Sequence, residues 1–171
     1  MRILAALTLA AGLSASANAQ SDFTELSRAE ALERYETVGE EFLEAFALIY
    51  TRTDPGLADY IGSPEWDEVD REAAACVYDT FAESGELENM AIVLEQTETA
   101  LERLREDDSI TMIALMTGEV DQAFMTEGMP EDVEERNTEV AMECGVVEAN
   151  GRRWANPELM QRLMALAEGA Q

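Results

Sequence analysis

Apolar side chains recur at intervals of three and four residues along most of the chain, which is the period of an amphipathic helix. The longest such segment covers residues 23–51, and Ser27 and Glu30 within it are spaced as an N-terminal capping box. Its apolar face carries Leu32, Tyr35, Gly39, Phe42, Phe46 and Ile49. The pattern predicts a long first helix whose face meets the core.

The same periodicity predicts helices over residues 64–83, 86–105 and 157–168, and another that begins near Ser109 and is interrupted at Gly118. Pro64 and Pro157 each follow a capping residue and precede an acidic residue, as at a helix N-terminus. Together with the remaining segments, they predict an all-α fold: a single-domain, mostly antiparallel bundle of five to six helices.

Residues 130–149 keep the helical spacing through Gly145, so we expect one helix here, ended by Asn150 and Gly151. The apolar positions that carry this spacing are Val133, Val140, Cys144 and Val147. An alternative is a β-hairpin about Asn150 and Gly151, which the unbroken spacing disfavours.

The N-terminus has the features of a secretory signal. Arg2 precedes a short apolar run over residues 3–13, and Ala17-Asn18-Ala19 fits a cleavage site. We therefore expect a cleaved signal peptide at residues 1–19 and a mature helical domain at residues 20–171. The run is short for a membrane span, so the mature chain is expected to be a soluble periplasmic protein without one.

Cys76 and Cys144 are the two cysteines of the chain. In an oxidising compartment such a pair predicts one disulfide, which would join the second and fifth predicted helices. Both cysteines lie on apolar faces, which indicates a staple buried in the core. A redox-active or metal-binding thiol pair is the alternative, but the chain has no C-x-x-C motif and no histidine or lysine to activate a thiol.

The charge balance is strongly acidic, with 37 Asp and Glu residues, 11 basic residues, no histidine and a formal net charge of −26. Such a field repels nucleic acids and anionic membranes, so neither is expected as a partner. Acidic residues are spread over the whole chain, which favours adaptation to salty surroundings. The clusters in residues 65–70, 106–108 and 131–135 stand mostly at predicted helix starts, where they stabilise the helix dipole, so only weak cation binding is expected.

The residues that are missing exclude most catalytic chemistry. Without histidine the chain has no Ser-His or Cys-His pair, and without lysine it has no Schiff base and no phosphate-binding loop. A carboxylate pair remains, but none stands out among so many acids. The sequence therefore predicts a protein that is not an enzyme and uses no cofactor.

Methionines four residues apart offer a metal hypothesis. On a helix such pairs direct two thioethers the same way, and thioethers suit Cu(I). We favour the alternative that methionine fills gaps in a core poor in aromatic residues. The copper candidates are Met112, Met116, Met160 and Met164, with Met125 and Met129 as a further pair.

Arg152, Arg153 and Trp154 form a short basic and aromatic segment, which is either a partner contact or a neutralising end to the preceding helix. In its general architecture, an acidic, disulfide-linked helical periplasmic protein resembles small acid-stress chaperones. We therefore expect a protein-interaction or chaperone-like accessory module that binds an unknown periplasmic protein. Binding of a small ligand or metal is the alternative. An internal cavity would favour a small ligand, and an exposed apolar patch would favour a protein partner.

Overall fold

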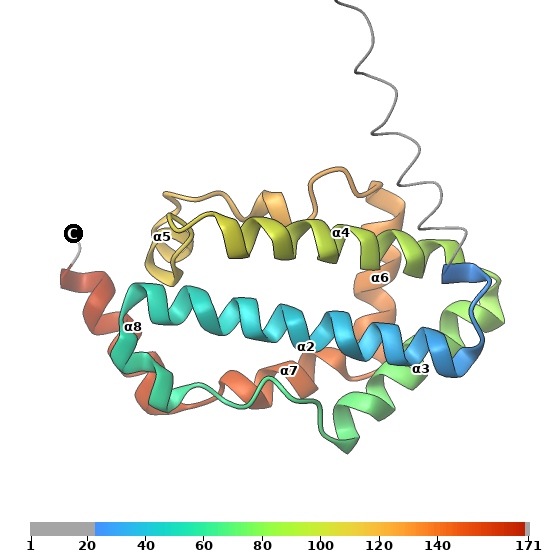
Figure 1. Ribbon diagram of the computed structural model, residues 1–171, viewed down its shortest axis with the longest axis horizontal. Coiled ribbons are helices and arrows are strands. Elements are labelled where there is room, and N and C mark those ends of the chain that lie inside the picture. The colour runs from blue at the N-terminus through green and yellow to red at the C-terminus, as the bar shows by residue number, and fades with distance from the viewer. Residues whose placement is uncertain (1–22, 170–171) are drawn as a thin grey trace, which may run out of the picture.

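The computed structural model describes residues 23–169, and every regular element within them is a helix (Figure 1). The all-α, single-domain prediction is therefore confirmed. The predicted signal peptide at residues 1–19 lies outside the described residues. In chain order the elements are α2 (Arg28–Thr53), η1 (Pro55–Tyr60), α3 (Glu68–Ser84), α4 (Leu87–Glu106), α5 (Met112–Thr117), η2 (Gln122–Met125), α6 (Glu131–Glu143), α7 (Val146–Trp154) and α8 (Pro157–Gly169), where η marks a 3-10 helix.

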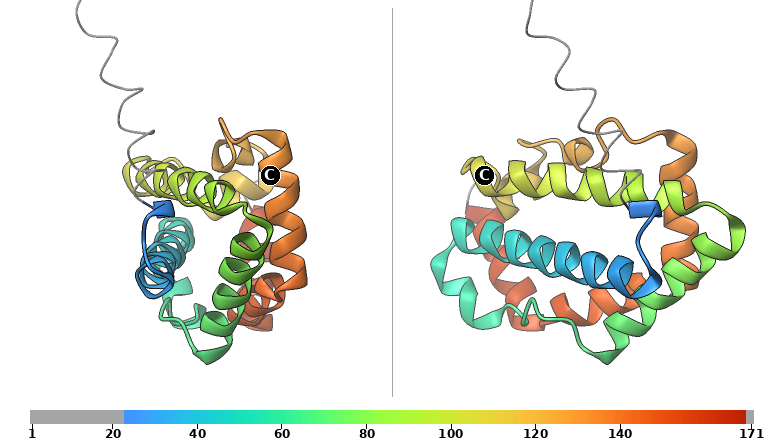
Figure 2. Two further views of the ribbon diagram at one scale, coloured as in Figure 1. Left: turned by 90° about the vertical axis from the view of Figure 1, so that its right-hand side faces the viewer. Right: turned by 45° about the vertical axis from the view of Figure 1, so that its right-hand side comes forward.

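The long helices α2 and α4 lie side by side and run in the same direction (Figure 1). Helix α3, which connects them in the chain, runs in the opposite direction. Two ion pairs with opposite residue order, Arg28–Asp79 and Arg71–Glu36, fix α3 antiparallel to α2. Viewed end-on, α2 stands on one side of the molecule, α3 and α6 stand on the other, and α4 runs across one end of the gap between them (Figure 2). No helix of residues 23–169 is long and apolar enough to cross a membrane.

Capping residues account for where α2 and α3 begin. The predicted box of Ser27 and Glu30 is present, with the Ser27 backbone N–H donating to Glu30 Oε2 at 2.9 Å. The start predicted for the second helix, at Pro64, is wrong. Asp67 accepts hydrogen bonds from the backbone of Val69 and Asp70, so α3 starts at Glu68 and residues 64–67 are not helical.

The single helix predicted over residues 130–149 is also wrong. Gly145 adopts a left-handed backbone conformation, with φ at 72°, which ends α6 and starts α7 in a new direction. Asn150 and Gly151 lie inside α7 instead of ending a helix, and no hairpin forms there. The spacing that predicted one helix does not mark one buried face: Val133 and Val140 of α6 are buried, whereas Val147 of α7 is exposed. Spacing alone does not report φ.

The Cys76–Cys144 disulfide is present, with the two Cα atoms 5.5 Å apart. It joins the middle of α3 to the C-terminal cap of α6, but it is not buried as the sequence indicated. Cys76 is exposed and Cys144 is half-buried, because the inward side of α3 instead carries Ala73, Ala74, Val77 and Phe81. The disulfide therefore links α3 to the end of α6 at the edge of the bundle, next to Gly145.

Candidate functional site: an apolar cavity

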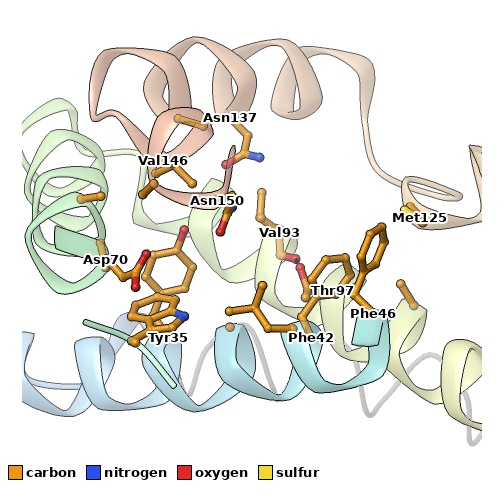
Figure 3. A pocket seen from close by; sticks show the side chains of 18 of the residues that line it. Tyr35, Phe42, Phe46, Asp70, Val93, Thr97, Met125, Asn137, Val146 and Asn150 are labelled. Carbon is orange, nitrogen blue, oxygen red and sulfur yellow. Dashed lines mark hydrogen bonds between the residues drawn. The ribbon is translucent and has the colours of Figure 1, made fainter. Parts of the chain in front are cut away.

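A cavity of about 460 Å³, partly open to solvent, lies between α2, α3, α4, α6 and α7 (Figure 3). Folded cores leave few voids larger than a water molecule, and this volume falls in the range of roughly 300–1,000 Å³ that is typical of ligand pockets. The lining residues are Tyr35, Gly39, Phe42, Leu43, Phe46, Trp66, Asp70, Ala73, Ala74, Val93, Thr97, Ala100, Met125, Thr126, Met129, Asn137, Ala141, Val146, Ala149, Asn150 and Trp154.

Helix α2 supplies one complete wall of the cavity. Its contribution of Tyr35, Gly39, Phe42 and Phe46 is most of the apolar face that the sequence predicted. These positions face inward as expected, but the aromatic side chains are only half-buried because no side chain from the opposite helices fills the space in front of them. The apolar face predicted to meet the core is therefore the wall of a cavity.

Trp66 forms one end of the cavity and depends on Gly39. The indole meets the ring of Tyr35 edge-on, with centroids 5.6 Å apart, and the Trp66 backbone N–H donates to Glu40 Oε1 at 2.8 Å. A β-carbon on Gly39 would lie 2.2 Å from Cζ2 of this indole. Glycine at this position in a helix interior therefore makes room for the tryptophan.

Aromatic rings from α2 and α7 form another part of the wall. Trp154 stacks on Tyr50, with ring planes 5° apart and centroids separated by 5.2 Å, and it also contacts Phe46. Phe46 in turn stacks on Phe42. These contacts join the rings into a continuous apolar surface.

Asp70 is the single carboxylate among the lining residues, and it is ion-paired. Arg153 donates from its guanidinium to Asp70 and to the backbone carbonyls of Ser63 and Glu65, the last at 2.9 Å. The side chains of Arg153 and Asp70 are only 10% and 5% exposed. The charge of Asp70 is therefore neutralised within the protein, and the cavity has no pair of carboxylates for acid–base catalysis.

Uncharged hydrogen-bonding groups meet at one end of the cavity, from Tyr35 on α2, Asn137 on α6 and Asn150 on α7. In Figure 3 the Tyr35 hydroxyl points toward Asn150, with Asn137 beyond it, whereas Phe42, Phe46 and Met125 lie together at the other end. Burial raises the pKa of Tyr35 to about 12, so its hydroxyl keeps its proton at neutral pH. The cavity thus has an apolar end at Phe42, Phe46 and Met125 (the aromatic end) and an end with the uncharged hydrogen-bonding groups of Tyr35, Asn137 and Asn150.

The segment Arg152–Trp154 does not form one exposed patch. Arg152 is exposed and lies 3.7 Å from Asp67, Arg153 is committed to Asp70, and Trp154 is half-buried in the cavity wall. The segment therefore closes the bundle, because it brings the end of α7 against the start of α3.

The methionine pairs lie in three different settings. Met112 is buried while Met116 is exposed, so these two thioethers do not share one environment. Met160 and Met164 are both exposed on α8. Met125 and Met129 instead line the cavity. Within the described part of the chain, no three His, Cys, Asp or Glu side chains are grouped so that they could hold a metal ion.

Several lining residues were not identified as site residues from the sequence, notably Trp66, Asn137 and Asn150. The available signals were Gly39 in the apolar face of the first predicted helix and Asn137 among the valines of the helix predicted over residues 130–149. Neither signal indicates a cavity by itself, because both also occur in filled cores.

No protein-family model, no curated protein and no solved structure matches this chain.

Proposed function

We propose that this protein binds an apolar small molecule in the cavity between α2, α3, α4, α6 and α7 and does no chemistry on it. The observation that carries the proposal is the cavity of about 460 Å³ walled by the rings of Tyr35, Phe42, Phe46, Trp66 and Trp154. Concave, mostly apolar sites with a few polar groups are typical of small-ligand binding.

The character of the lining supports binding over catalysis. Its residues include no serine, cysteine, lysine or histidine that could act as a nucleophile or base. Asp70 is held by Arg153, and Tyr35 stays protonated. The predicted export signal adds a setting for the proposal, since an apolar molecule that crosses an aqueous periplasm benefits from a soluble carrier.

A fluorescent probe tests the proposal directly. The chain has two tryptophans, and both line the cavity. The neutral dye N-phenyl-1-naphthylamine should therefore bind with 1:1 saturation, gain emission, and accept energy from Trp66 and Trp154. Non-saturable dye emission, or saturation without energy transfer, would reject binding at this site.

A pair of variants locates the bound dye. Val93→Phe places a ring in the cavity and should weaken dye binding at least tenfold, while Val69→Phe adds the same ring at an exposed position outside the cavity and should not. Circular dichroism of both variants checks that the helices are intact. Equal dye affinity for Val93→Phe and the unchanged protein would contradict the proposed site.

Binding of another protein, the function expected from the sequence, is a second proposal. Met160 and Met164 are exposed on α8, whereas the neighbouring Leu159 and Leu163 are buried, and methionine surfaces adapt to varied partners. If they bind unfolded clients, Met160→Gln with Met164→Gln should reduce the suppression of client aggregation in a light-scattering assay. Dye binding in the cavity should be unchanged in this variant.

A further inference from the structure

We infer that the cavity selects an uncharged amphiphile, with its hydrocarbon chain against Phe42, Phe46 and Met125 and a neutral polar head at Tyr35, Asn137 and Asn150. The inference rests on the proposed function and adds the chemical class and the orientation of the ligand. It follows from the unequal distribution of polar groups along the cavity (Figure 3).

The aromatic end of the cavity, at Phe42, Phe46 and Met125, is mostly apolar. Phe42 and Phe46 stack with centroids 5.7 Å apart, and the adjoining Leu43 and Ala100 are buried. Two threonines lie near this end: Thr97 already donates to the Val93 carbonyl at 2.8 Å, and Thr126 directly follows Met125 in the chain. Met125 brings a flexible thioether, which adapts to the shape of a hydrocarbon chain.

The opposite end has hydrogen-bonding groups that the protein leaves unused. Among residues 23–169, neither the Tyr35 hydroxyl nor the side-chain amides of Asn137 and Asn150 make a hydrogen bond to another protein group. A purely apolar ligand that excluded water from the Tyr35 hydroxyl would leave a buried donor unsatisfied, which costs about 1–3 kcal/mol. A hydroxyl, ester or carbonyl head removes this penalty.

The charges around the cavity disfavour a charged head. An anion finds no cationic side chain in the lining, because Arg153, whose two terminal nitrogens donate to Asp70 and to two backbone carbonyls, is not a lining residue, and the net charge of −26 repels anions. A cation finds one lining carboxylate, that of Asp70, which is already ion-paired with Arg153. The edge-on contact of Trp66 with Tyr35 also keeps these two rings from enclosing a cation between their faces. A neutral head avoids the cost of burying an unpaired charge.

Three probes with the same decyl chain and different head groups test the inference, through their displacement of bound N-phenyl-1-naphthylamine at pH 7.5. We expect 1-decanol to displace the dye at a concentration at least tenfold lower than undecanoate or decyltrimethylammonium requires. Equal or better displacement by undecanoate or by decyltrimethylammonium would overturn the selection of a neutral head. If the dye itself does not bind, the proposed function fails, which is a distinct outcome.

A hydroxyl deletion tests the orientation of the bound amphiphile. Tyr35→Phe should weaken decanol binding, measured directly by isothermal titration, about fivefold to tenfold relative to the unchanged protein, since one hydrogen bond is removed. Tyr60→Phe, at a tyrosine whose ring faces Arg162 and lies outside the cavity lining, is the matched control and should leave decanol affinity unchanged. Asn150→Ala should also weaken decanol binding. Unchanged decanol affinity in both Tyr35→Phe and Asn150→Ala would overturn the inference.

Discussion

The Trp66 indole packs directly against Gly39, so that a β-carbon added to Gly39 would lie 2.2 Å from Cζ2 of Trp66. This contact joins the middle of α2 to the segment before α3. It explains why a residue that weakens helices sits within the longest helix of the protein. It also sets the position of Trp66 at the end of the cavity.

We expect Gly39→Ala to destabilise the protein by about 1–3 kcal/mol, since the overpacking against Trp66 outweighs the gain in helix propensity. Chemical denaturation gives the free energy of unfolding, and tryptophan emission reports the displaced indole. Gly151→Ala is the matched control: residue 151 lies inside α7 and an added β-carbon meets nothing within 4 Å. It should stabilise by about 0.5–1 kcal/mol. If both variants shift stability in the same direction, the contact with Trp66 does not act as described.

Loss of the Cys76–Cys144 disulfide should lower the free energy of unfolding by about 2–4 kcal/mol, because a loop with a sequence separation of 68 gains freedom in the unfolded chain. Because Cys76 is exposed, dithiothreitol should reduce the bond without a denaturant. Melting curves with and without the reductant measure the loss. Cys76→Ser, Cys144→Ser and the double variant should be equally destabilised, and a clear difference between the single and double variants would contradict a simple cross-link.

Removing one partner of the buried Asp70–Arg153 pair leaves an uncompensated charge, so Asp70→Asn and Arg153→Met should each destabilise by about 3–5 kcal/mol. The double variant should lose clearly less than the sum of the two. Arg152→Met is the control, since Arg152 is exposed and its pair with Asp67 contributes about 1 kcal/mol at most. Additive losses in a double-mutant cycle, measured by denaturation, would show that the two side chains are not coupled.

The capping box of α2 should make stability depend on pH. Hydrogen bonds from the Ser27 side chain and backbone hold the pKa of the Glu30 carboxyl below its usual range. A carboxyl whose pKa is depressed on folding stabilises the protein above its unfolded pKa and loses this effect as the pH falls through its folded pKa. Glu30→Gln should therefore be less stable than the unchanged protein at pH 7, and the difference should shrink toward pH 3.

Glu33→Gln removes an exposed carboxylate from the same helix and controls for the change in net charge. Its stability relative to the unchanged protein should not follow the pH profile of Glu30→Gln in thermal melts. A difference in stability between Glu30→Gln and the unchanged protein that stays constant from pH 7 to pH 3 would contradict the role of the ionised carboxylate.

Local signals in the sequence determined most of the helices. Ser27 and Glu30 mark the start of α2, and Gly85, with φ at 75°, ends α3 where a glycine after an apolar run predicts a helix end. The Cys76–Cys144 pairing also followed from the sequence. These features depend on neighbouring residues or on the presence of two cysteines, so one chain was enough to predict them.

Tertiary structure alone decided how these helices meet. The break at Gly145 depends on a φ angle that apolar spacing does not encode, and it places Asn150 within α7, beside the cavity. The periodic face of α2 shows that Tyr35, Phe42 and Phe46 turn away from water. It does not show whether side chains from α3, α4 and α6 fill the space opposite them. That depends on contacts between residues far apart in the chain, which is why a core was predicted and a cavity was found.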